Sequence, residues 1–182
     1  MYGDLNFQGK NLQGRTFINM DLRDANFKNA NLVGVDFRGS DLRGANFEGA
    51  NLFGSDLDDT LLDNVRYDNN TKYFQMYCPI EGPFLGYKKC YNFRIVQLLI
   101  PADAKRSSAT RNTCRCDKAK VLTIKSIDCK DSFDEAISYV DENFVYKVGQ
   151  WVKAENFNED RWVESTTGIH FFMTREEAIG YL

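Results

Sequence analysis

The chain has 182 residues, of which 43% are hydrophobic, and this is enough to build the core of one or two domains. Its 23 Lys and Arg residues nearly balance its 26 Asp and Glu residues, so the net charge of −3 gives no global field that favours nucleic acid or a membrane surface. We expect no membrane segment and no leader, because no apolar stretch approaches the length of a transmembrane helix and no basic segment precedes an apolar run at the N-terminus. Five cysteines without a secretion signal favour reduced thiols and a cytoplasmic location.

The first part of the chain repeats every five residues from Leu5 to about Asn69. The centre of each unit is large and apolar, the residue two positions earlier is mostly small, and the residue just before the centre is mostly Asn or Asp. Most units end in Gly, Asn or Asp, and a fixed short period punctuated by turn formers indicates a solenoid. The thirteen central residues are Phe7, Leu12, Phe17, Leu22, Phe27, Leu32, Phe37, Leu42, Phe47, Leu52, Leu57, Leu62 and Tyr67.

Units such as 25–27 (Ala-Asn-Phe) and 45–47 (Ala-Asn-Phe) resemble the pentapeptide-repeat family, and the resemblance covers residues 1–70. It implies a β-solenoid of the right-handed quadrilateral β-helix type, with one pentapeptide on each of its four sides. The central Leu or Phe and the small residue two positions earlier would then point inward. A period of five fits neither the 3.6 of a helix nor the 2 of a strand, so the sequence itself supports a chain that turns a corner at every fifth residue.

With four sides, residues twenty apart lie above one another, so that aromatic and leucine columns alternate around the solenoid. We expect Phe27, Leu32, Phe37 and Leu42 to be buried, and Gly or Asn at the corners to accept positive φ. One aromatic column is expected to contain Phe7, Phe27, Phe47 and Tyr67.

The five-residue phase is lost after Tyr67, and Asp68–Thr71 has the composition of a turn, which marks a boundary. Residues 71–83 are placed to cap the last coil and to link it to an α+β domain over residues 84–182. That domain resembles an uncharacterised domain found behind pentapeptide repeats in bacteriophage and bacterial proteins, a resemblance that implies relatives but no activity. The stretches that resemble it are 105–110, 114–119, 145–149 and 168–172.

Hydrophobic patterning within residues 84–182 predicts several strands and two helices. An apolar stripe at helical spacing predicts a helix over residues 131–140, and the sequence of residues 174–177 (Thr-Arg-Glu-Glu) predicts a capping box that opens a terminal helix. Strands are expected over residues 84–90, 93–100, 120–127, 144–153 and 169–173, with a bulge at Gly149.

A basic, hydroxyl-rich stretch between Lys105 and Lys120 is the first candidate site. Guanidinium groups and backbone N–H groups could hold phosphate there, so the stretch predicts an anion or nucleotide site. The alternative is a solvated polar loop, because hydroxyl-rich loops are ordinary turn material. The candidate ligand-binding residues are Lys105, Arg106, Ser107, Ser108, Thr110, Arg115 and Lys118.

The cysteines are a second candidate. Cys114 and Cys116 could bind a metal together with Cys78, Cys90 or Cys129. Their spacing lacks the paired C-x-x-C pattern of zinc sites, and free cysteines commonly behave as small core residues. We therefore predict no metal and no cofactor.

The one histidine, His170, is the third candidate, because with Tyr146 and Glu176 it could form a transferase-like site. No phosphate-binding, dinucleotide or nucleophile motif accompanies it. Alternation along its strand places His170 opposite Ile169 and Phe171, so a structural histidine is the preferred interpretation and no catalytic residue is assigned.

The surface of the solenoid is the fourth candidate. Gln13, Val33 and Phe53 occupy equivalent outward positions that become apolar toward the C-terminal end, so Val33 and Phe53 are interface candidates. Only four residues precede the repeats, which leaves the first coil thinly protected, and we expect a homodimer.

The resemblance also implies a DNA mimic that inhibits topoisomerases, as an alternative function. Residues 1–70 contain eleven acidic and seven basic residues, a net charge of −4. A little over three turns make a rod of roughly 15 Å. DNA of that length carries about nine negative charges, so the rod is too short and too weakly charged to replace a duplex.

The sequence therefore predicts a non-enzymatic binding protein, encoded by a phage or prophage, that uses a rigid repeat platform to present its second domain to a host protein. Three alternatives stay open. They are sequestration of a phosphate-bearing small molecule by the basic loop, a transferase around Tyr146, His170 and Glu176, and the DNA mimic. Nucleic acid and membrane are not expected as partners.

Overall fold

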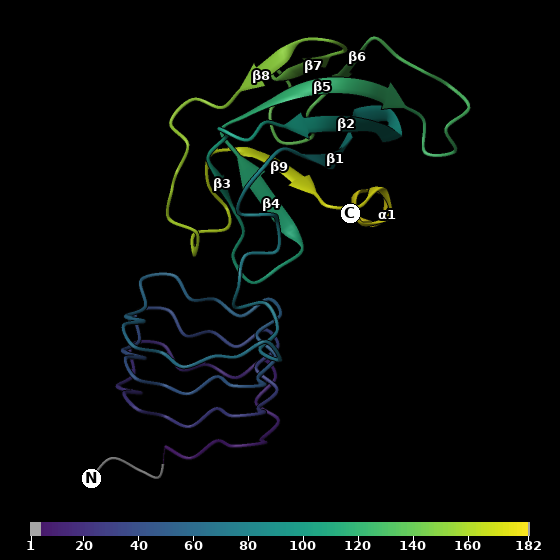
Figure 1. Cartoon of the computed structure of the whole chain (residues 1–182). Helices are drawn as coiled ribbons and strands as arrows, with labels where there is room; N and C mark the ends of the chain where they lie inside the picture. The colour runs from purple at the N-terminus through teal and green to yellow at the C-terminus, as the bar shows by residue number, and fades with distance from the viewer. Residues whose placement is uncertain (1–4, 182) are drawn as a thin grey trace. The chain divides into compact units, whose positions relative to one another are not determined.

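The structure of the chain, a computed structural model, describes residues 5–181 and divides into two compact units (Figure 1). Unit 1 contains the residues up to Met76 together with two short segments from later in the chain, Ala109–Arg111 and Trp162–Glu164. The predicted boundary segment is divided between the units, because its residues after Met76 belong to unit 2. Unit 2 contains Tyr77–Ser108, Asn112–Arg161 and the residues from Ser165 onward.

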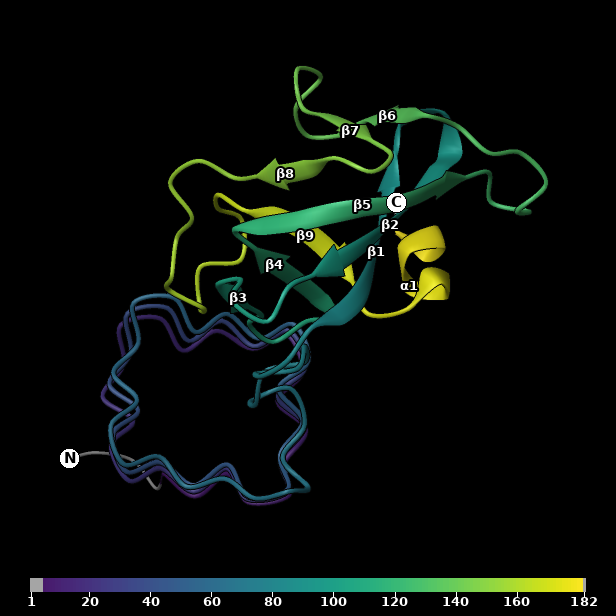
Figure 2. The same ribbon diagram turned by 45° about the horizontal axis from the view of Figure 1, so that its top comes forward.

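Unit 1 is a repeat β-fold in which the chain returns to an equivalent position after twenty residues. Parallel bridges join Asn26 to Asn46 and Asn46 to Arg66. Backbone hydrogen bonds connect the same coils, as when the Phe27 N–H donates to the Asn46 carbonyl at 2.8 Å. A tight turn closes each pentapeptide, with the Ala30 N–H donating to the Phe27 carbonyl at 3.0 Å. Each coil therefore contains four pentapeptides, and Figure 2 shows the coils superposed.

The central residues of the repeats fill the interior of unit 1. Phe27, Leu32, Phe37 and Leu42 are all fully buried, which confirms that prediction. Rings twenty residues apart stack, with 5.4 Å between the centroids of Phe27 and Phe47. Rings of different columns meet edge to face, with 5.6 Å between Phe27 and Phe37. Both arrangements are favourable for aromatic pairs beyond the area that they bury, so the columns stabilise the stack.

The corners explain why Gly, Asn and Asp end the pentapeptides. Gly39 has a φ of 68° and Asn19, one coil earlier, has a φ of 55°. A Cβ atom at Gly39 would lie 2.2 Å from the side-chain oxygen of Asn19, so the close approach of the two corners requires glycine. The Asn or Asp before each centre also has a local use. The Asn26 side chain accepts a hydrogen bond from the Lys28 N–H at 3.1 Å, which supports the corner.

The C-terminal end of the repeat departs from the five-residue period by one residue. Asn51 pairs with Lys72, whereas the preceding residues pair with partners twenty positions on. Thr71 occupies the irregular position, where its hydroxyl oxygen lies 3.0 Å from the Phe47 carbonyl and 2.9 Å from the Asp68 carboxylate. The loss of phase that the sequence shows after Tyr67 is therefore a real irregularity in the coil.

Phe74 covers the last ring of the aromatic column. Its centroid lies 5.8 Å from Phe47 and 4.8 Å from Tyr67, and its side chain is buried. The sequence predicts Tyr67 in this column, but the structure places Phe74 over Phe47 and leaves Tyr67 48% exposed. Trp162, from a much later part of the chain, packs on Phe74 at 5.5 Å.

A second late segment pairs with the same end of the repeat. The Gly54 N–H donates to the Thr110 carbonyl at 2.9 Å, and the Thr110 hydroxyl donates to the Ser55 carbonyl at 2.6 Å. Next to it, Arg111 forms an ion pair with Glu164 at 2.7 Å. Backbone groups that an open solenoid end would expose are therefore paired by a segment that residues 71–83 do not include.

Unit 2 is built on a seven-stranded antiparallel sheet in the order β3-β4-β9-β1-β2-β5-β8 (Figure 1). Strands β6 and β7 form a separate two-stranded sheet, and a short turn, η1, connects β1 to β2. The bounds are β1 Phe84–Cys90, η1 Tyr91–Phe93, β2 Arg94–Ile100, β3 Arg106–Ser107, β4 Thr113–Cys116, β5 Lys118–Lys125, β6 Glu135–Ile137, β7 Val145–Lys147, β8 Trp151–Lys153, β9 Ile169–Phe172 and helix α1 Arg175–Gly180.

The predicted helix over residues 131–140 is wrong. Strand β6 occupies its middle and pairs with β7, with Ala136 opposite Tyr146. Ala136 is fully buried, whereas Ile137 is 39% and Val140 80% exposed, so the apolar residues do not share one helical face. Pairing with β7 imposes a period of two on a segment whose spacing indicates a helix.

Other expectations for unit 2 have mixed outcomes. Strand β1 has the predicted bounds, and Thr174 forms the predicted capping box with Glu177 at the start of α1. The strand expected over residues 144–153 is divided into β7 and β8 by a turn in which Gly149 has a φ of 81°, and the two strands lie in different sheets. Strands β3 and β4 are not predicted by the sequence. Within residues 5–181 the α-helical content is limited to α1, which is too short to cross a membrane, and no other helix there could span one.

Candidate interaction surface

Basic side chains of the predicted anion-binding loop have a structural role in unit 2. The guanidinium group of Arg106 donates to backbone carbonyls at distances from 2.7 to 3.4 Å, and it lies 5.1 Å from the ring of Phe84. A guanidinium group has five N–H donors. In Arg106 the donors that could bind phosphate already bind backbone carbonyls. The acceptors are the carbonyls of Pro79, Gly82, Pro101, Ala102 and Ala104.

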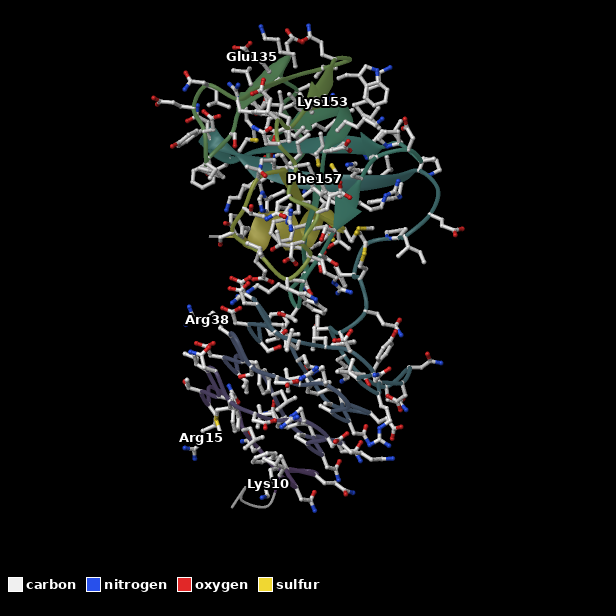
Figure 3. All side chains as sticks on the ribbon, turned by 90° about the vertical axis from the view of Figure 1, so that its left-hand side faces the viewer. Lys10, Arg15, Arg38, Glu135, Lys153 and Phe157 are labelled. Carbon is white, nitrogen blue, oxygen red and sulfur yellow. The ribbon has the colours of Figure 1, made fainter. Side chains whose placement is uncertain are left out.

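Arg115 is used in the same way on the other side of the loop. It is 3% exposed and donates to the carbonyls of Asn158, Asp160 and Thr167, and it lies 5.3 Å from the ring of Phe157, which Figure 3 labels. This side chain therefore holds the irregular segment between β8 and β9 in place.

The remaining candidates of the loop do not converge on one pocket. Lys105 pairs with Glu159 and Lys118 with Asp103 in exposed ion pairs. The Ser108 hydroxyl accepts the Tyr77 N–H, the Thr110 hydroxyl donates to Ser55, and the Ser107 side chain is buried with no protein partner for its hydroxyl. The anion site stays a prediction, and the geometry gives these side chains other uses.

The three residues of the transferase alternative are not assembled. Tyr146 is 2% exposed, and burial raises its pKa well above the usual value, with Cys90 and Cys116 nearby. Cys116 is the register partner of Ile169, so it faces the side of the sheet where Ile169 and Phe171 are buried. His170 alternates to the opposite side, as the sequence predicts, with its Nδ1 3.2 Å from the Gly168 carbonyl. Glu176 is exposed on α1.

The acids of the repeat unit are interleaved with basic residues. Arg38 lies 2.7 Å from Asp36 and 3.5 Å from Asp56, and its side chain points outward from the repeat (Figure 3). Lys28 pairs with Glu48 at 2.8 Å. Alternating pairs of this kind do not reproduce the continuous negative charge of a DNA backbone, so they give the DNA-mimic alternative no support.

The predicted interface strip on the repeat is partly covered. Val33 is half-buried, and the Gly34 N–H donates to the Phe53 carbonyl at 2.9 Å, which places the two residues on neighbouring coils. Phe53 is 38% exposed, and Tyr73 lies against its ring at 4.9 Å. The strip of Gln13, Val33 and Phe53 therefore stays a prediction, with less free apolar area than the sequence indicates.

The turn between β1 and β2 has an unusual backbone that the sequence analysis missed. Asn92 and Phe93 have φ values of 56° and 55°, as in a type I′ turn, and the Arg94 N–H donates to the Tyr91 carbonyl. Asn tolerates this conformation, but a bulky side chain there is strained by roughly 1–2 kcal/mol. Gly is the usual second residue of such a turn, and Phe93 stands in its place.

Exposed apolar side chains gather around this turn. The bridge between Cys90 and Ser138 places the turn beside the segment that follows β6 (Figures 1 and 2), and the rings of Tyr91 and Tyr139 lie 4.8 Å apart. Single exposed hydrophobic residues are ordinary, but several of them on neighbouring segments indicate a candidate contact surface. We call this group the tip surface: Tyr91 is 44% exposed, Phe93 62%, Tyr139 37% and Val140 80%.

The basic side chains near the tip surface donate hydrogen bonds to backbone carbonyls, whereas the acidic ones are exposed. The Lys89 ammonium lies 5.7 Å from the Phe93 ring but donates to the Ile179 and Tyr181 carbonyls at 3.1 and 2.7 Å. Arg94 donates to the Glu135 carbonyl at 2.7 Å. The exposed acids at 141 and 142 directly follow Val140, so the rim of the surface presents carboxylates to solvent.

Comparison with known proteins finds two families along the chain. A model of a family of unknown function, DUF5758, matches residues 74–178, and a model of pentapeptide repeats in eight copies matches residues 6–44 and 21–59. The predicted arrangement of pentapeptide repeats followed by that second domain is confirmed. Pentapeptide repeats indicate a protein-interaction or structural role. No curated protein matches the chain.

Two solved structures are similar to part of the chain. The pentapeptide repeat protein Rfr23 from the cyanobacterium Cyanothece 51142 is 34% identical over 36% of this chain and 44% of its own, with a TM-score of 0.35. AT2G44920, a pentapeptide repeat protein from the thylakoid lumen of Arabidopsis thaliana, is 28% identical over 32% of this chain and 51% of its own, with a TM-score of 0.18. The chain therefore spans about half the length of these proteins.

Proposed function

Because the chain belongs to the DUF5758 family and has pentapeptide repeats ahead of that domain, we propose that it is a binding protein without enzymatic activity. Unit 1 serves as a rigid platform, and unit 2 binds another protein through the tip surface. For unit 1 we propose the right-handed quadrilateral β-helix of pentapeptide-repeat proteins, which the twenty-residue coils support. A phage or prophage origin, a host protein as partner and a cytoplasmic location stay predictions.

The observation that supports binding at the tip surface is the strained and exposed Phe93. Its positive φ destabilises the turn, yet its ring is 62% exposed and so buries little apolar area that could offset the strain. Strained backbone conformations persist only where the surrounding structure enforces them, and they are frequent at functional sites. A second protein that covers the ring would supply the missing burial.

The chemistry of the surface indicates the kind of partner. Aromatic side chains such as Tyr91 and Phe93 dominate the energy of protein interfaces, where they contact apolar anchors of the partner. The carboxylates of Asp141 and Glu142 at the rim favour basic residues beside that anchor, which raises the association rate and the specificity. We therefore propose a partner segment with an aliphatic anchor flanked by Lys or Arg.

Selection of peptides from a displayed random library on the full chain tests this proposal. The selected peptides are expected to combine an aliphatic residue with basic neighbours and to bind more weakly as salt rises. Phe93→Asn keeps the turn conformation but removes the ring, and we expect it to weaken binding at least tenfold.

The matched control is Ile80→Asn. Ile80 is 73% exposed in unit 2 and lies before the other end of β1, outside the tip surface. This variant is expected to bind like the wild type. Peptides that bind Phe93→Asn as tightly as the wild type, or that are acidic, contradict the proposed surface.

For self-association we propose contact between first coils. Phe7 and Leu12 are only partly buried there, and Ile18 and Met20 are 39% and 42% exposed. The chain mass is 21.0 kDa, so light scattering at micromolar concentration is expected to give roughly twice that mass. A mass of one chain in both wild type and Met20→Ser removes the proposal, whereas a dimer that Met20→Ser weakens supports it.

A further inference from the structure

Strand β8 forms an open edge of the seven-stranded sheet. It is the last strand in the sheet order, and within residues 5–181 it pairs with β5 alone (Figure 2). The Ala154 N–H donates to the carbonyl of Asp117, the residue before β5, at 2.7 Å. Antiparallel strands bond to a neighbour through alternate residues, so the backbone N–H and C=O groups of Trp151 and Lys153 point away from β5. These groups are therefore available to a further strand.

An exposed indole lies on this edge. Trp151 is 57% exposed, whereas the next residue, Val152, is 9% exposed, so Trp151 and Lys153 lie on the face of the sheet opposite the core. Across the sheet the same row of residues reaches Leu85, which is 41% exposed. Tryptophan is highly buried on average and is enriched at protein interfaces. An indole this exposed beside an open edge therefore indicates a contact.

The face around Trp151 is basic. In the register of β5 and β8, Trp151 lies opposite Lys120. Lys153, which Figure 3 labels, lies opposite Lys118, so three ammonium groups share a face with the indole. Lys118 pairs with Asp103 at 2.6 Å, but in the described part of the chain Lys120 and Lys153 form no ion pair. The edge therefore has an excess of positive charge.

This charge indicates what can occupy the edge. Lysines on an edge strand oppose pairing with a second copy of the chain, because two copies bring like charges together. An acidic segment has no such barrier, since its carboxylates can pair with Lys120 and Lys153. The nearby acid Glu155 lies beyond the strand, in the turn that follows it. Nucleic acid is also anionic, but it lacks the backbone N–H and C=O pattern that complements a strand edge.

We propose that an acidic segment of a partner protein adds to β8 as an antiparallel strand. Its backbone bonds to the outward N–H and C=O groups of Trp151 and Lys153, and its outward side chains give specificity. An apolar side chain on the indole and a carboxylate beside Lys153 are the expected anchors. The site goes beyond the proposed function, because the tip surface favours a basic segment and this edge favours an acidic one.

Fluorescence polarisation with labelled, end-blocked peptides on the full chain tests the proposal. In an added strand the peptide Glu-Val-Leu-Val-Glu places both Glu side chains and Leu on the outward face. It is expected to bind about tenfold more tightly than Lys-Val-Leu-Val-Lys, and more weakly as salt rises.

N-methylated forms of the acidic peptide test the backbone pairing. Methylation at Leu removes an N–H that faces β8 and is expected to weaken binding about tenfold. Methylation at the second Val removes an N–H that faces solvent, so this peptide is expected to bind nearly like the parent. Equal binding of the two methylated peptides overturns strand addition.

Variants of the protein test the location. Lys153→Glu reverses a charge on the edge and is expected to weaken binding of the acidic peptide about tenfold. The matched control is Lys130→Glu, which makes the same change beyond the other end of β5, on a side chain that is 81% exposed. Lys130→Glu and Phe93→Asn are both expected to bind like the wild type, so failure at the tip surface and failure at β8 are distinguishable.

Three outcomes overturn the proposal. One is an acidic peptide that does not bind the wild type, or that binds Lys153→Glu equally well. Another is a single-stranded oligonucleotide that displaces the peptide, which assigns the surface to nucleic acid. The third is a dimer in light scattering that Trp151→Ser disperses, which assigns the edge to a second copy of the chain.

Discussion

Unit 1 and unit 2 satisfy their backbone polar groups in different ways. In unit 1 the partner of an N–H lies on the next coil, so one pentapeptide pattern sets hydrogen bonds, corners and core together. In unit 2 the irregular segments depend on single side chains, above all Arg106 and Arg115, which donate to several carbonyls each. A repeat therefore distributes its stability over many equivalent residues, whereas unit 2 concentrates it in a few.

The largest expected effect tests burial within the repeat. Phe27→Ala removes a fully buried ring between two stacked neighbours and is expected to destabilise the protein by about 3–5 kcal/mol. Phe7→Ala, at the first coil, is the matched control, because its ring is only partly buried and a smaller loss is expected. Urea unfolding followed by circular dichroism measures both. Equal losses of unfolding free energy in the two variants would contradict the expectation that the loss grows with the burial of the ring.

The next effect tests the concentration of stability in unit 2. Arg106→Met keeps the length of the side chain but leaves several carbonyls without donors, so we expect a loss of about 2–3 kcal/mol. Lys105→Met, which breaks an exposed and solvent-screened ion pair with Glu159, is expected to change stability far less. An Arg106→Met protein as stable as wild type, with a nucleotide-induced rise in melting temperature that the variant loses, would restore the anion site.

A smaller effect tests the pairing of the late segment with the repeat. Thr110→Val removes the hydroxyl that donates to the Ser55 carbonyl, and the expected loss is about 1–2 kcal/mol. Trp162 belongs to unit 1 and Trp151 to unit 2, so their fluorescence reports the units separately in single-Trp variants. The Trp162 transition is expected to move more than the Trp151 transition. Equal shifts would mean that Thr110 does not act on unit 1 in particular.

The smallest effect is a pH dependence at the end of the repeat. Hydrogen bonds from the Gly49 N–H and the Thr71 hydroxyl lower the pKa of Asp68 to about 2. Because this is below the ordinary value of 3.8, the carboxylate stabilises the fold above about pH 4 and loses this contribution as the pH falls through 2. Melting temperatures of wild type and Asp68→Ala should differ at pH 5 and converge toward pH 2. A difference that persists at pH 2 contradicts this assignment.

The same comparison explains what the sequence could predict. The burial of Phe27 and the capping box at Thr174 follow from local spacing, and both are confirmed. The role of Arg106 could not be predicted, because its acceptors are backbone carbonyls, which every residue has. The helix over residues 131–140 failed because pairing with a distant strand decides the conformation of that segment.

The tip surface was missed for a related reason. The sequence predicts a strand that begins at Phe93, whereas β2 begins at Arg94 and Phe93 lies in the turn. Asn92 between two strand patterns is a signal for a turn, but the positive φ of Phe93 is invisible in a sequence where Gly is the expected residue. The bridge between Cys90 and Ser138 brings the exposed residues Tyr139 and Val140 close to this turn.

If the Phe93 ring serves binding and not folding, its removal in Phe93→Asn should not destabilise the protein. Asn tolerates the positive φ, so the variant is expected to be more stable than wild type by about 0.5–1 kcal/mol while it loses peptide binding. Urea unfolding of the two proteins under identical conditions gives the difference. A variant that is clearly less stable than wild type would show that the Phe93 ring supports the fold, and it would contradict the account.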